Sequence, residues 1–115
     1  MEKTIRQLLN DYNTEIFNKD ILPDRATEIL RDISSLYGNI LDKIKDTEVL
    51  YNIVLLGFLD SEKKANRAKI KAEITKEYQD LQDAINAEKI ALQTIRSLNR
   101  FIDSKKEEIR NSKYQ

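Results

Sequence analysis

The second half of the chain, from Phe58 to Gln115, contains neither glycine nor proline. These residues most readily end a helix, and the whole chain of 115 residues holds only two glycines and one proline. Apolar residues recur through the same region at spacings of three and four, which is the period of an amphipathic helix. The sequence therefore predicts an all-α fold with a long C-terminal helix.

The single proline and the apolar spacing divide the chain into four expected helices within one domain over residues 1–115. Pro23 disfavours helix at the residue before it and suits the first turn of the helix after it. No glycine or proline enforces a turn at 45–48 or at 74–76, so a continuous helix is an alternative at both places. The expected architecture is an elongated helical bundle or hairpin with a coiled-coil-like C-terminal helix. The expected helices cover residues 2–17, 24–45, 48–73 and 76–110.

The most apolar part of the chain lies at the start of the expected helix over 48–73. We expect its side chains to form the centre of the core, because large apolar residues are the ones most often buried. They are Val49, Leu50, Tyr51, Ile53, Val54, Leu55, Leu56, Phe58 and Leu59. Gly38 lies inside the preceding helix, where it favours a close helix crossing over a functional hinge.

A heptad pattern runs along the C-terminal helix. Eleven positions between residues 74 and 109 alternate spacings of four and three, and eight of them hold apolar side chains. Such a seam packs against another helix, either in a hairpin or in a self-associating coiled coil. We expect a homo-oligomer whose interface contains Ile74, Tyr78, Leu81, Ile85, Leu92, Ile95 and Ile102.

Positive charge is concentrated in the second half of the chain, although the formal net charge is zero. Residues 61–76 hold six basic and two acidic side chains, with alanines between them. Lys63, Arg67 and Lys71 follow one another at intervals of four, so they share one helix face. Such a face can contact a phosphate backbone or an acidic protein, and a solvated face is the default interpretation.

Two aromatic residues lie near the basic positions. Tyr78 and Phe101 could stack on exposed bases. Both also fall on or beside the apolar seam, which favours packing in the core. The sequence pI of about 6.3 argues against a dedicated high-affinity DNA-binding protein, because such proteins are usually strongly basic.

Cysteine and histidine are both absent. Their absence excludes disulfides, His- or Cys-based zinc sites and the usual nucleophile–base pairs, and two glycines cannot make a phosphate-binding loop. Carboxylates could still bind magnesium, as Asp80 with Asp83 or Asp103 with Glu107, but their basic neighbours favour a solvated face. We expect no enzymatic activity, no catalytic residues, no metal and no cofactor.

The polar start of the chain lacks the apolar core of a signal peptide. The longest apolar run, residues 53–59, has seven residues, whereas a membrane-spanning helix needs about 20. Absence of cysteine fits a reducing compartment. We therefore expect a cytoplasmic protein without a membrane partner.

Residues 62–73, with Glu77, Tyr78 and the segment 95–98, resemble a pattern in small helical proteins of tailed phages that are encoded among recombination and replication genes. The chain is also distantly similar to phage recombination mediators of the UvsY type. These proteins load a recombinase onto single-stranded DNA, form ring-like oligomers and bind the DNA through a basic helical segment. The resemblance spans roughly residues 60–110, and it implies DNA contacts at Lys63, Lys64, Arg67, Lys69 and Lys71.

Taken with the basic positions Arg96 and Arg100, these features lead to one expected function. The chain is expected to be a non-enzymatic, oligomeric helical protein, encoded by a phage and acting in the host cytoplasm. Its expected partners are single-stranded DNA or recombination proteins. The alternative is a protein-interaction module, such as a small anti-defence inhibitor or an assembly adaptor.

Overall fold

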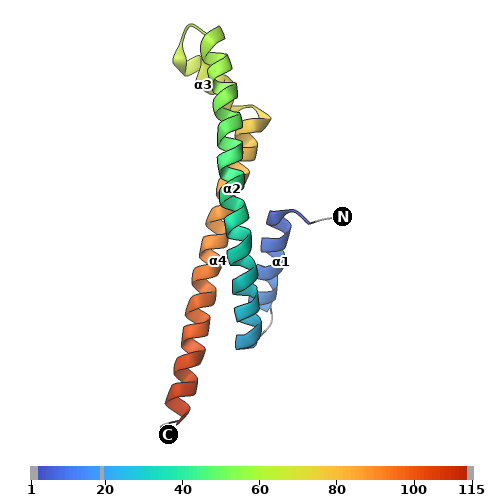
Figure 1. Ribbon diagram of the computed structural model, residues 1–115, viewed down its shortest axis with the longest axis vertical. Helices are drawn as coiled ribbons and strands as arrows, with labels where there is room; N and C mark the ends of the chain where they lie inside the picture. The colour runs from blue at the N-terminus through green and yellow to red at the C-terminus, as the bar shows by residue number, and fades with distance from the viewer. Residues whose placement is uncertain (1–2, 19, 114–115) are drawn as a thin grey trace. The chain divides into compact units, whose positions relative to one another are not determined.

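The computed structural model describes residues 3–18 and 20–113, and these contain four α-helices and no strand (Figure 1). The prediction of an all-α fold is confirmed. Contacts cluster in two compact units, whereas the sequence analysis expects one domain. The first unit combines Met1–Gly38 with Lys89–Gln115, and the second is Asn39–Glu88.

Helix α1 (Ile5–Asn18) belongs to the first unit, and its start is fixed by a capping box. The Thr4 amide donates to Gln7 Oε1 at 2.8 Å, and the Gln7 amide donates to Thr4 Oγ1 at 3.1 Å. This reciprocal pair satisfies two amides at the helix start. The expected start at Glu2 lies outside the described residues.

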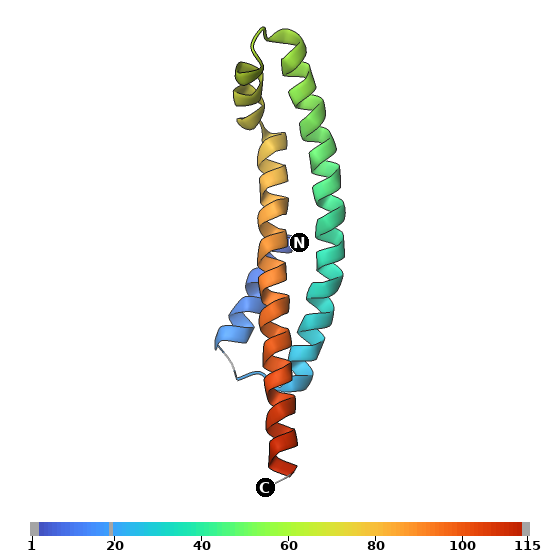
Figure 2. The same ribbon diagram turned by 90° about the vertical axis from the view of Figure 1, so that its left-hand side faces the viewer.

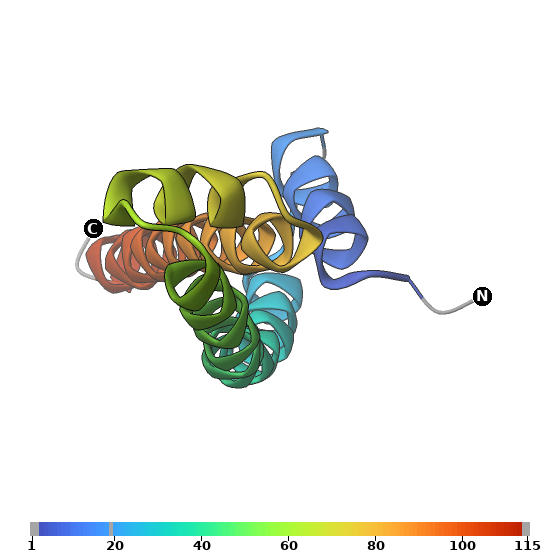
Figure 3. The same cartoon turned by 90° about the horizontal axis from the view of Figure 1, so that it is seen from above.

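The core of the first unit forms where α1 meets the start of α2 (Pro23–Ser61) and the second part of α4 (Lys76–Lys113) (Figures 1 and 3). The fully buried large side chains there are Leu9, Ile29, Ile33 and Leu98. Asn13 also lies inside this packing: its Nδ2 donates to Leu9 O at 3.0 Å, and its Oδ1 accepts from Thr94 Oγ1 at 3.1 Å. These bonds explain why α1 continues through a residue of low helix propensity.

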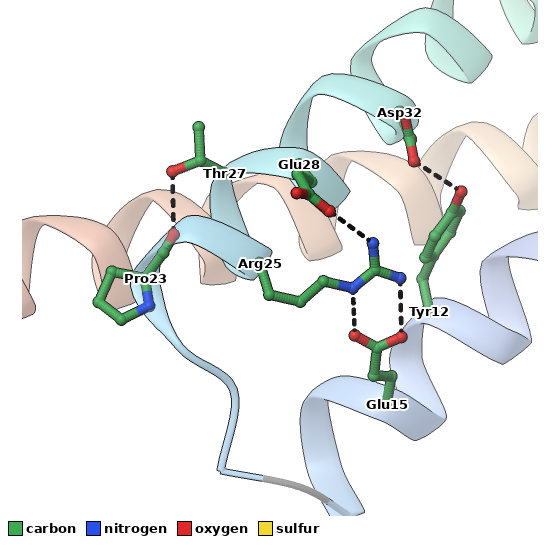
Figure 4. A network of polar contacts seen from close by, with 7 residues as sticks. All are labelled: Tyr12, Glu15, Pro23, Arg25, Thr27, Glu28 and Asp32. Carbon is green, nitrogen blue, oxygen red and sulfur yellow. Dashed lines mark hydrogen bonds and ion pairs between the residues drawn. The ribbon is translucent and has the colours of Figure 1, made fainter.

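Polar contacts tie α1 to the first turns of α2 (Figure 4). Arg25 donates from Nε and Nη2 to the two carboxylate oxygens of Glu15, at 2.6 and 2.9 Å, and from Nη1 to Glu28 at 3.0 Å. Tyr12 Oη donates to Asp32 at 3.0 Å, and burial together with this bond raises the pKa of Tyr12. The bidentate contact of Arg25 with Glu15 fixes the angle at which the chain enters α2.

Helix α2 runs without interruption from Pro23 to Ser61, so of the two alternatives left open at 45–48 the structure has the continuous helix. Thr47 is buried, and its hydroxyl donates to the carbonyls of Lys43 and Ile44 at 2.8 and 3.1 Å instead of capping a new helix. A threonine that bonds back to the preceding turn can remain inside a helix. The predicted helices 24–45 and 48–73 are therefore one helix to residue 61, followed by a short separate one.

The second unit is a helical hairpin, in which α3 (Ala65–Glu73) and the first part of α4 run back along the last part of α2 (Figure 2). Of the two alternatives left open at 74–76, the structure has the turn and not a continuous helix. Thr75 closes it: its hydroxyl donates to Ala72 O at 2.6 Å and accepts from the Tyr78 amide at 3.4 Å. Helix α4 then continues to Lys113, three residues beyond the predicted end.

The core of the second unit differs from the sequence prediction. Its buried apolar residues are Ile40, Ala68, Ala72, Leu81, Ala84 and Ala87. Val49, Leu50, Ile53 and Leu56 were expected at the centre of the core, but they are 58%, 53%, 59% and 61% exposed. The apolar run is longer than one helix face can bury against a single layer of partner helices, so half of it faces outward.

Gly38 does not mark a close helix crossing. It is exposed, and a Cβ added there would meet no atom within 4 Å apart from its immediate helical neighbourhood. Among the described residues, no helix is both long and apolar enough to cross a membrane.

Candidate nucleic-acid interface

Three basic side chains gather where α2 ends and α3 begins. Lys63, Lys64 and Arg67 are all exposed, and with Ser61 and Glu62 they line a hollow of about 380 Å³. In the described part of the chain, none of the three makes an ion pair. We call Lys63, Lys64 and Arg67 the basic turn. It brings together three of the residues that the sequence analysis selected.

The start of α3 adds to the positive potential of the basic turn. Lys64 occupies the N-cap position, with φ −115° and ψ 128°, and its side chain makes no capping hydrogen bond. The first amides of a helix have no partner within the helix, and the helix dipole is positive there. Uncapped amides beside three cations favour a bound anion such as a phosphate.

Lys71 has a different role from the other basic residues of this segment. Its Nζ forms an ion pair with Glu62, across the turn between α2 and α3. The hydrogen bond from Lys71 lowers the pKa of the Glu62 carboxyl, and Arg67 adds a smaller electrostatic effect in the same direction. Lys71 therefore shares its charge with an internal partner and holds the turn in shape.

The remaining predicted DNA contacts belong to different units. Lys69 is exposed on α3 in the second unit. Arg96 and Arg100 are exposed on α4 in the first unit, where Arg100 Nε donates to Arg96 O at 3.5 Å. Their role in binding nucleic acid stays a prediction.

The two aromatic residues considered for base stacking have partners within their own units. The rings of Tyr78 and Tyr51 lie 5.3 Å apart at 50°, and burial is the main cause that raises the pKa of Tyr51. Lys105 Nζ lies 5.7 Å from the centre of the Phe101 ring. The contacts of Tyr78 favour the packing interpretation.

Most side chains of the heptad seam of α4 are buried or half-buried within the chain itself. Leu81 is buried, whereas Ile74, at the α3–α4 turn, is 83% exposed. The other five members are half-buried: Tyr78, Ile85, Leu92, Ile95 and Ile102. The deepest positions of α4 are instead the small residues Ala84, Ala91 and Thr94, together with Leu98. An oligomer interface along this seam stays a prediction.

A second hollow lies in the first unit and has no cluster of catalytic groups. It measures about 540 Å³, and its lining combines apolar side chains such as Ile16, Leu98 and Phe101 with the polar side chains of Asp20, Ser97 and Lys105. Within the described residues, no three carboxylates come together to hold a metal ion. Asp83 of the magnesium candidates accepts a hydrogen bond from Gln79.

The sequence analysis missed one exposed feature. Val49, Leu50, Ile53 and Leu56 form a continuous apolar surface on α2, which we call the α2 stripe. The spacing along the sequence could have revealed this stripe. Positions 40, 44, 47, 51, 54 and 58 face the other helices of the second unit, and positions two residues later fall on the opposite face of α2. Contiguous apolar patches of this kind often mark interaction sites.

No family model, no curated protein and no solved structure matches the chain.

Proposed function

We propose that this chain is a non-enzymatic helical protein that binds single-stranded DNA through the basic turn. The observation that carries the proposal is the convergence of Lys63, Lys64 and Arg67 on the uncapped start of α3. Exposed cations such as these can each displace a counterion from a phosphate backbone. The resemblance over residues 60–110 supports a role beside recombination proteins in a host cytoplasm.

Fluorescence anisotropy with a labelled oligonucleotide at low salt tests this proposal. The double variant Lys63→Glu/Arg67→Glu should lose binding, because it replaces two phosphate ligands with like charges. Lys106→Glu/Arg110→Glu is the matched control: it changes the net charge equally at exposed positions of the first unit and should bind as the unmodified chain does. Equal binding by both variants, or no binding by the unmodified chain, contradicts the proposal.

Two further variants refine the set of contacts. Arg96→Glu/Arg100→Glu tests whether the first unit contributes, and weaker binding would extend the interface to α4. Lys69→Glu tests the flank of α3. Retained binding in these variants would confine the contact to the basic turn.

A second candidate function is a protein-interaction module, and the α2 stripe favours it. Four large apolar side chains that are each more than half exposed need a reason on a chain of this size. A pull-down from a host lysate that survives nuclease treatment and is lost in Ile53→Glu supports this function.

A further inference from the structure

The α2 stripe continues into charged residues at both ends. Positions 42, 46, 49, 53, 56 and 60 follow one another at spacings of four and three, which is a heptad line. Its centre is Val49, Ile53 and Leu56, and Leu50 lies beside it. Its ends are the exposed residues Asp42, Asp46 and Asp60. The line spans about 27 Å of helix, at about 1.5 Å per residue.

Helix α2 therefore carries heptad lines on two opposite faces. The line through Ile40, Thr47 and Val54 faces the packing of the second unit. The line through the α2 stripe faces outward, and its side chains are not buried against the other helices of the second unit. A straight helix with a heptad of apolar residues on its free face is suited to pair with another helix.

We propose that the α2 stripe binds the α2 stripe of a second copy of this chain, in antiparallel orientation about a twofold axis. A second copy supplies the same heptad spacing, so the apolar centres of the two stripes can match. The charges select the direction of pairing. Antiparallel pairing centred near Ile53 brings Asp42 of one copy beside Lys63 and Lys64 of the other copy, whereas Asp46 meets Asp60, so each copy contributes one attractive and one repulsive contact.

Parallel pairing would be unfavourable on the same grounds. It would place Asp42, Asp46 and Asp60 of one copy beside the same three residues of the other copy. Like charges placed opposite one another cost free energy, and opposite charges across an interface fix its register. All of these residues belong to the second unit.

The oligomeric state of the unmodified chain tests whether a second copy binds the α2 stripe. Light scattering coupled to size exclusion should give a dimer without nucleic acid, and Ile53→Glu should give a monomer with unchanged helical circular dichroism. Ile53 is 59% exposed, so its replacement leaves the core intact. Ile74→Glu, at the most exposed member of the α4 seam, is the matched control and should remain dimeric.

A monomeric unmodified chain overturns the proposal, and so does an oligomer that survives Ile53→Glu but is lost in Ile74→Glu. Because dimerisation is measured without DNA, either result leaves the nucleic-acid proposal standing on its own assay.

Thiol cross-linking tests the orientation. The chain contains no cysteine, so each variant carries one thiol. A short bis-thiol reagent should join Asp46→Cys to Lys63→Cys in a mixture of the two variants. It should not join two Asp46→Cys chains, because residues 46 and 63 are about 25 Å apart along an extended helix axis. Cross-links between two Asp46→Cys chains would show parallel pairing and overturn the antiparallel arrangement.

Discussion

At the scale of single residues, the basic segment divides into cations with different surroundings. Lys71 is paired with Glu62, whereas Lys63, Lys64 and Arg67 line an open hollow. The spacing of four residues between Lys63, Arg67 and Lys71 suggested that they act together. Spacing alone could not show the difference, because the pairing depends on the turn that carries Glu62 back toward α3.

The Glu62–Lys71 pair predicts a specific dependence on pH. Lys71 lowers the pKa of Glu62 below its usual value of 4.5. The ionised Glu62 carboxylate therefore stabilises the folded state above about pH 4.5. That contribution is lost as the pH falls through the lowered pKa. In Lys71→Met, an NMR titration should show the pKa of Glu62 rise. Lys69→Met should leave it low, and an unchanged pKa in Lys71→Met would contradict the ion pair.

Gly38 provides a prediction about stability. It lies exposed in the interior of α2, and an added Cβ meets open space. Alanine is about 1 kcal/mol more favourable than glycine in such a position. Gly38→Ala should therefore raise the free energy of unfolding by about that amount, measured by chemical denaturation. A decrease would show that the helix crossing expected from the sequence exists after all.

At the scale of the helices, the sequence indicates features that depend on local hydrogen bonds better than features that depend on packing between helices. The turn at Thr75 was left open by the sequence, which offered Thr75 as a cap, and its hydroxyl does cap α4 through a local hydrogen bond. The turn left open at 45–48 does not exist, because Thr47 is buried and bonds to the preceding turn. Apolar density predicted a core around Ile53, but burial depends on which face meets a neighbour. The sequence selected the residues of the basic turn but expected them inside the helix 48–73, and it did not reveal the α2 stripe.

Helix α3 depends on two small residues for its packing. Ala68 and Ala72 are fully buried, whereas Ala65 is exposed at the start of the same helix. Ala72→Leu should lower the free energy of unfolding by about 1–3 kcal/mol, because added methylene groups overfill a packed site. Ala65→Leu is the matched control and should change it little. Equal effects of the two substitutions in chemical denaturation would contradict the close approach of α3.

At the scale of the whole molecule, the two proposals concern different surfaces of the second unit. The basic turn lies at the end of α2, and the α2 stripe lies along its outer face. An antiparallel dimer would therefore carry two basic turns, one toward each end of the paired helices. A single strand of DNA that reaches both turns would contact more cations than a strand on one chain, although Asp42 of the second copy neutralises one lysine of each basic turn.

The salt dependence of DNA binding distinguishes these two cases. For single strands, the logarithm of the binding constant falls with the logarithm of salt concentration by about 0.7 per phosphate contact, so the three cations of one chain give a slope of about −2 and the four free cations of the dimer give about −3. With a long oligonucleotide, the unmodified chain should show the steeper slope and Ile53→Glu the shallower one. Ile109→Glu, an exposed position of α4 in the first unit, should keep the steeper slope. A slope of about −2 in all three proteins would mean that dimerisation does not join the two basic turns on one strand.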